Sequence, residues 1–136
     1  MSLDYILELE GDPPDWAACI EAARRAGVTT LNTRGDRLDD ATFKDSSGFF
    51  WATENWRSRL SAISAEGDHG CSFLTRWSIV FRLNNIAYEE NREDIRRFCI
   101  ELSARSKMEF VLSFQLEGVR ATRDGRGLIW SWDEPR

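Results

Sequence analysis

The chain contains one histidine, His69, which lies two residues before Cys71, one of its three cysteines. A general base beside a thiol is the arrangement that activates a cysteine nucleophile, and histidine is the commonest such base. His69 lies in a turn between Gly67 and Gly70, however, and no third catalytic partner accompanies the pair. No serine lies in a GxSxG or SxxK motif. We expect a non-enzymatic protein, and an enzyme centred on His69 and Cys71 is the weakest hypothesis.

Two further residue patterns are of the types that bind metal ions or nucleotides. Carboxylates cluster at four positions, which are Asp36, Asp39, Asp40 and Asp45. The spacing of a calcium loop is missing, so a solvated connection is favoured. Gly125 and Gly127 lack the following helix and the lysine of a phosphate-binding loop, and a hairpin turn explains them.

The cysteines predict neither a zinc site nor a complete disulfide framework, because their number is odd and no CxxC pair occurs. Cys19 and Cys99 lie on the apolar faces of predicted helices, where buried free thiols are common. We therefore expect no metal ion and no cofactor.

Acidic residues are unevenly spread along a chain whose formal net charge is −5. Six carboxylates precede the first basic residue, Arg24, and a second group follows later. That second group consists of Glu89, Glu90, Glu93 and Asp94. An acidic surface repels nucleic acid and favours a basic partner. A solubilising surface with favourable charge at a helix N-terminus is the alternative.

Tryptophan is abundant, with six residues in the chain. Trp16 and Trp77 follow the apolar phase of predicted elements and should lie in the core. Trp130 and Trp132 share one face of a predicted final strand. Aromatic residues are enriched at binding hot spots, so this pair could anchor a partner, although capping of the core is the favoured alternative.

The strongest structural pattern runs from Trp77 to Glu117. Apolar residues alternate over 73–83 and over 109–120, which predicts two strands. Between them, apolar residues at helical spacing predict a helix over 91–106, with Asn91 as its N-cap.

The rest of the chain adds fewer elements. We expect a strand over 3–10 and a helix capped by Asp12 or Asp15 and ended by Gly27. The stretch 29–47 is expected to be mainly connection, with at most one short extended piece, and 49–51 is a second strand. Residues 53–70 fit either a helix or a continued strand and loop. A turn at Asp124 to Gly127 leads to an edge strand over 128–132.

This order predicts a single α+β domain over 1–136, a ferredoxin-like antiparallel sheet (β-α-β-β-α-β) with two helices on one face and an added C-terminal hairpin strand. The opposite face is expected to be open and semi-polar, suited to a partner or a second copy. Its predicted members are Ile6, Glu8, Glu10, Ser78, Val80, Arg82, Val111, Ser113 and Gln115. Since no apolar run could span a membrane and no signal peptide is evident, we expect a cytoplasmic protein without membrane contact.

One family resemblance accompanies these patterns. The segment FRLNN (81–85), followed by YEENREDIRRFCIELSARSKMEFVLSFQLEGVRATRDGRGL (88–128), resembles the C-terminal half of small bacterial immunity-type proteins. Such proteins are paired with polymorphic or contact-delivered toxins. The resemblance covers 79–130 and implies a cytoplasmic inhibitor that occludes a cognate toxin.

Two functions of different classes follow. The first is an immunity protein that binds a basic toxin through Glu89, Glu90, Glu93, Asp94, Trp130 and Trp132. The second is a small regulatory or ligand-sensing domain that forms a homodimer through its sheet. A toxin gene immediately upstream would favour the first, and a ligand-dependent rise in melting temperature would favour the second.

Overall fold

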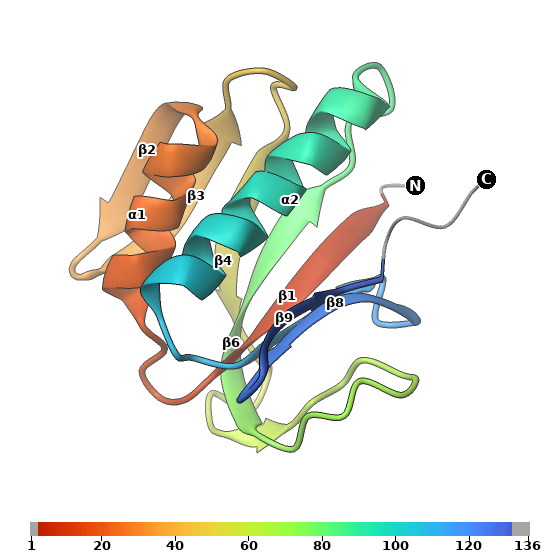
Figure 1. The fold of residues 1–136 in the computed structure, drawn as a ribbon. Helices are drawn as coiled ribbons and strands as arrows, with labels where there is room; N and C mark the ends of the chain where they lie inside the picture. The colour runs from red at the N-terminus through yellow and green to blue at the C-terminus, as the bar shows by residue number, and fades with distance from the viewer. Residues whose placement is uncertain (1–2, 132–136) are drawn as a thin grey trace.

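The computed structural model describes residues 3–131 and consists of one sheet with two helices packed on one of its faces (Figure 1). In chain order the elements are β1 (Asp4–Glu10), α1 (Trp16–Ala26), β2 (Val28–Arg34), β3 (Arg37–Phe43), β4 (Phe49–Glu54), β5 (Ser61–Ala62), β6 (Leu74–Arg82), α2 (Tyr88–Arg105), β7 (Phe110–Phe114), β8 (Gly118–Asp124) and β9 (Gly127–Trp130). The sheet order is β2-β3-β4-β6-β1-β7-β8-β9, with β5 paired to β6, and all strand pairs are antiparallel. No described helix is both long and apolar enough to cross a membrane.

The predicted α+β class, antiparallel sheet and position of the helices are confirmed, but the predicted extent of the sheet is wrong. The four strands β4, β6, β1 and β7 form its centre. The hairpin β2–β3 extends the sheet beyond β4, and the strands β8 and β9 extend it beyond β7. Over residues 3–131 the sheet therefore has nine strands, whereas the prediction had the four strands of the β-α-β-β-α-β order and one added hairpin strand.

The expectation that 29–47 is mainly a connection is wrong, because β2 and β3 form a hairpin closed by Gly35, whose φ of 61° suits a tight turn. β2 is the edge strand and is mostly exposed, so it needs few apolar residues. Irregular pairing near Asn32 and Thr33 also breaks the period of two.

The single strand predicted over 109–120 is in fact two strands. Gln115 and Leu116 have φ angles of 52° and 66° and form the turn between β7 and β8. Leu116 continues the alternation of Phe110 and Leu112 in the sequence but does not continue their strand. Residues 53–70 contain no helix: β4 runs to Glu54, and a turn leads to the short β5.

Helix α2 begins three residues earlier than predicted. Its N-cap is Ala87, which makes no capping side-chain hydrogen bond, and Asn91 lies fully buried inside the helix. Helix α1 agrees with the prediction, since the Asp15 carboxylate accepts a hydrogen bond from the Ala18 amide and Gly27 ends the helix.

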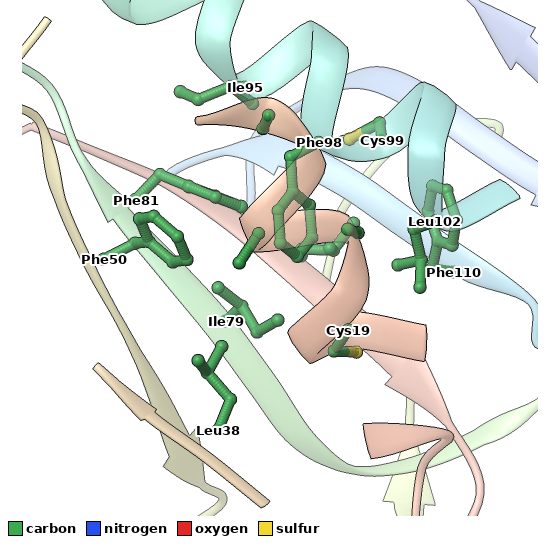
Figure 2. Packing of buried hydrophobic residues seen from close by; sticks show 14 of the residues in the cluster. Cys19, Leu38, Phe50, Ile79, Phe81, Ile95, Phe98, Cys99, Leu102 and Phe110 are labelled. Atoms are coloured by element: carbon green, nitrogen blue, oxygen red, sulfur yellow. The ribbon is translucent and has the colours of Figure 1, made fainter. Parts of the chain in front are cut away.

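The core lies between the sheet and the two helices (Figure 2). Phe98 of α2 makes edge-to-face contacts with Phe50 and Phe81, at centroid distances of 5.7 and 5.3 Å. Cys19 and Cys99 are free and completely buried, as predicted. The alternating apolar side chains of the central strands thus point toward the helices.

The opposite face of the sheet is only half open, which corrects another expectation. Several side chains predicted to be open are buried, namely Glu8, Val80, Val111 and Ser113. Ala65 and Phe73 from the segment 61–73 pack against Val111, forming a small second cluster of buried residues. The part of this face formed by β3, β4 and the C-terminal end of β6 remains bare.

Candidate protein-binding surfaces

Three of the predicted contact residues form an exposed surface on the first two turns of α2. Glu89, Glu90 and Glu93 all point into solvent, and we name them the α2 acidic surface. Carboxylates near a helix N-terminus are stabilised by the helix dipole. Glu93 pairs with Arg96 at 3.6 Å, and both residues line a shallow hollow of about 250 Å³ with Glu89 and Arg92. Arg92 and Arg96 therefore partly offset the negative potential of the three glutamates.

Asp94 does not belong to this surface, and its prediction as a partner contact is wrong. Its side chain is 0 % exposed. One carboxylate oxygen accepts the Ser46 backbone amide at 3.2 Å, and the other accepts the Arg97 guanidinium at 2.9 Å. Burial raises the pKa of the Asp94 carboxyl, while these hydrogen bonds oppose the rise. Asp94 therefore acts as a buried hydrogen-bond acceptor inside the fold.

Trp130 lies beside the α2 acidic surface. It is half-buried and packs against the core, so the structure favours the capping role. The Arg96 guanidinium lies 5.8 Å from the centre of its ring, which connects Trp130 to Glu93 through one shared arginine. Trp132, the other predicted aromatic contact, lies outside the described residues.

The bare half of the sheet carries a second candidate surface, which the sequence reasoning did not identify. Phe49 and Trp51 stack with their ring centres 5.6 Å apart, and the Arg82 guanidinium lies 5.0 Å from the centre of the Trp51 ring. These three residues, which we name the open-face cluster, line a hollow of about 470 Å³ together with Asp39 and Asp40. Phe49 is 43 % exposed. The alternation of side chains along a strand could have predicted this surface: because Phe50 is buried, its neighbours Phe49 and Trp51 must face the opposite side of the sheet.

Two carboxylates of the acidic cluster between Asp36 and Asp45 have local partners. Asp39 pairs with Arg34 at 3.6 Å, and Asp40 accepts a hydrogen bond from Asn32 at 2.7 Å. Within residues 3–131, no group of three or more histidine, cysteine, aspartate or glutamate side chains is placed to hold a metal ion.

His69 and Cys71 are close together, but their geometry does not activate the thiol. His69 Nδ1 accepts a hydrogen bond from the Cys71 backbone amide at 3.1 Å. Burial raises the pKa of the Cys71 thiol, and the nearby Glu109 and Asp124 carboxylates raise it further. A thiol with a raised pKa holds little of the reactive thiolate at neutral pH.

Thiol labelling tests this geometry. We expect Cys71 to react slowly with a disulfide reagent at neutral pH, and Cys19 and Cys99 to react only on unfolding, because burial raises their pKa as well. Replacing His69 by alanine should change the Cys71 rate by less than about twofold, since the imidazole bonds to the backbone. Fast labelling that is lost in His69→Ala would contradict this description.

Comparison with known proteins leaves the function to be inferred from these surfaces. No protein family model, curated protein or solved structure matches the chain. The described residues define an α+β protein with a single sheet, one acidic helix surface and one aromatic sheet surface. Exposed aromatic and arginine side chains are enriched at contacts between proteins, and exposed carboxylates steer the approach of a positively charged partner.

Proposed function

We propose that this protein is a non-enzymatic, cytoplasmic immunity protein that binds and blocks a cognate bacterial toxin. The observation that carries the proposal is the α2 acidic surface, where Glu89, Glu90 and Glu93 are all exposed. The resemblance of residues 79–130 to immunity-type proteins supports the same function. We further propose that β4, β6, β1 and β7, with α1 and α2 as crossovers, form a ferredoxin-like core enlarged at both sheet edges.

A basic toxin suits this surface for two physical reasons. Carboxylates on a protein of net charge −5 attract a positive partner over about 8 Å at physiological salt, which speeds the encounter. Trp130 is half-buried and caps the core, and because it adjoins the carboxylates through Arg96, we propose that its exposed part also offers an aromatic contact at the edge of the surface. The carboxylates would steer the toxin, and the aromatic edge would slow its release.

Charge reversal tests the proposal. The double variant Glu89→Lys and Glu90→Lys changes the net charge from −5 to −1, because each reversal adds two units. We expect association with the toxin encoded beside the gene to slow about tenfold at low salt, and the difference to shrink as salt screens the charges. Stopped-flow measurements over a salt series give the rates.

The matched control is the double variant Glu66→Lys and Glu117→Lys. Both glutamates are exposed and lie outside α2, and the change in net charge is the same. If the two double variants slow association equally, only the net charge matters and the α2 acidic surface is not the interface. A purified toxin that shows no binding to the unaltered protein would remove the proposed function.

A further inference from the structure

A hollow of about 400 Å³ lies between two loops at the end of the sheet where α2 begins (Figure 1). The β3–β4 turn forms one side of this hollow, and the β6–α2 connection forms the other. Phe49, Leu83 and Ile86 supply its apolar lining. Arg82 also lines the hollow, and its guanidinium pairs with Asp4 at 2.9 Å. The hollow is therefore apolar in part, and its arginine has a local counter-charge.

Hydrogen bonds from a single asparagine hold the two loops together. Asn84 Nδ2 donates to the Ser46 carbonyl at 2.6 Å, and the Asn84 backbone amide donates to Asn91 Oδ1 at 3.1 Å. Asn84 Oδ1 in turn accepts the Ile86 backbone amide at 3.0 Å. Ser47, at the opposite wall, has a φ of 60°, which a serine keeps only where its surroundings fix it. The backbone around the hollow is thus already ordered, so a partner does not have to order it on binding.

Ile86 projects into solvent at the rim of the hollow. It is 99 % exposed, and Phe49 beside the hollow is 43 % exposed. A single exposed apolar side chain is ordinary on a protein surface, but this one lies on an ordered loop next to a concavity. A small ligand inside the hollow would leave Ile86 in water, whereas a protein surface would cover Ile86 and fill the hollow at the same time. The shape therefore suits a protein partner.

The charges beside the hollow favour a basic partner. The α2 acidic surface begins three residues after Ile86, with two exposed glutamates in succession. The positive charges nearby have negative neighbours, because Arg82 is paired with Asp4 and Lys44 is followed by Asp45. An apolar side chain that enters the hollow is therefore best accompanied by a lysine or arginine that faces the glutamates.

We propose that the hollow is the anchor site for the toxin: Ile86 inserts into the toxin surface, and an apolar toxin side chain flanked by a basic residue fills the hollow. This assignment rests on the proposed function, because the toxin is the occupant, but it uses side chains other than the carboxylates. The carboxylates act on the rate of encounter, whereas an apolar anchor acts on the rate of release. The two contributions can therefore be measured separately.

Binding kinetics of Ile86→Ser with the toxin encoded beside the gene test the anchor site. We expect the dissociation rate, and with it Kd, to rise at least about tenfold, because the variant loses its apolar contact. The association rate should stay within about twofold of the unaltered rate at every salt concentration, since no charge changes. Because Ile86 is 99 % exposed in the free protein, the melting temperature should not change.

The matched control is Leu74→Ser, which removes an isomeric side chain that is 52 % exposed at the opposite end of β6 and should change neither rate. Asn85→Trp tests the hollow itself: Asn85 is exposed and lines the hollow, so an indole there should occupy the space and raise Kd at least about tenfold.

The outcomes separate the anchor site from the proposed function. If the toxin binds, but Ile86→Ser releases it no faster than Leu74→Ser does, the anchor site is wrong and the proposed function stands. The same conclusion follows if Asn85→Trp binds the toxin as tightly as the unaltered protein. A purified toxin that does not bind the unaltered protein removes both the proposed function and the anchor site.

Discussion

Replacing Asp94 by alanine should lower the free energy of unfolding by about 2 to 3 kcal/mol, because the change leaves a buried amide without its acceptor. The Ser46 backbone amide donates to Asp94, and Ser46 is only 2 % exposed. The lost pair with Arg97 adds little, since that guanidinium is 39 % exposed and remains hydrated.

The loss should be large because Asp94 belongs to a buried polar network. The backbone amide of Asn84 donates a hydrogen bond to Asn91 Oδ1 at 3.1 Å, and the side-chain Nδ2 of Asn84 donates to the Ser46 carbonyl at 2.6 Å. Packing here is tight: a Cβ added at Gly48 would lie 2.2 Å from Asn91 Nδ2. The network joins the β3–β4 turn, the β6–α2 connection and α2, so water has little room to replace the carboxylate.

Two variants isolate the contribution of Asp94 in urea unfolding. Asp94→Asn keeps an acceptor for the Ser46 amide and should cost about 1 kcal/mol or less. Glu93→Ala removes the neighbouring exposed carboxylate and should change stability by less than about 0.5 kcal/mol. If Asp94→Ala costs no more than Glu93→Ala, the buried acceptor has no role in stability.

The sequence predicted the centre of the sheet because two physical constraints agree there. Alternating apolar residues such as Ile79 and Phe81 must be covered by an apolar surface, and Phe98 and Leu102, which lie four residues apart on one side of a helix, form such a surface. These two patterns together predict an antiparallel sheet with helices on one of its faces and leave few other arrangements possible.

The edge strand β9 was predicted from the turn at Asp124 to Gly127, but the β2–β3 hairpin and the turn between β7 and β8 were missed because neither constraint acts on them. Most of β2 is exposed, so its sequence carries no alternation, and only the turn at Gly35 indicates a hairpin. The positive φ angles of Gln115 and Leu116 occur at residues that do not favour them, so the turn between β7 and β8 had no glycine to signal it.

Three of the four carboxylates predicted for the acidic surface lie on it, and the fourth, Asp94, could have been excluded. Asp94 lies four residues before Phe98 and eight before Leu102, so it shares their side of α2. Its charge suggested exposure, although its position indicated burial. Only the structure reveals the acceptor role, because Ser46 is 48 positions distant along the chain.

Glu8 is a second buried carboxylate, and its replacement by alanine should free the segment 61–73 from the sheet. Glu8 is 3 % exposed, and its two carboxylate oxygens accept the Ser64 and Ala65 amides at 2.7 and 2.9 Å. We expect a loss of about 2 kcal/mol in the free energy of unfolding. Amide hydrogen exchange at Ser64 and Ala65 should rise at least about tenfold. Glu66→Ala, which alters an exposed carboxylate nearby, is the control and should change neither quantity.

The pH dependence of stability separates the two forces that act on Glu8. Burial raises the pKa of its carboxyl, and the hydrogen bonds from Ser64 and Ala65 oppose that rise without cancelling it. The pKa of the Glu8 carboxyl is higher in the folded protein than its value of about 4.3 in the unfolded chain. Its contribution to the free energy of unfolding is therefore complete below the unfolded pKa and is lost as pH rises through the folded pKa. Glu8→Gln cannot titrate, so the unaltered protein should lose stability relative to Glu8→Gln as pH rises from about 4 toward neutrality. A relative gain over the same range, measured by urea unfolding at each pH, would show that the two amides outweigh burial and hold the carboxylate ionised.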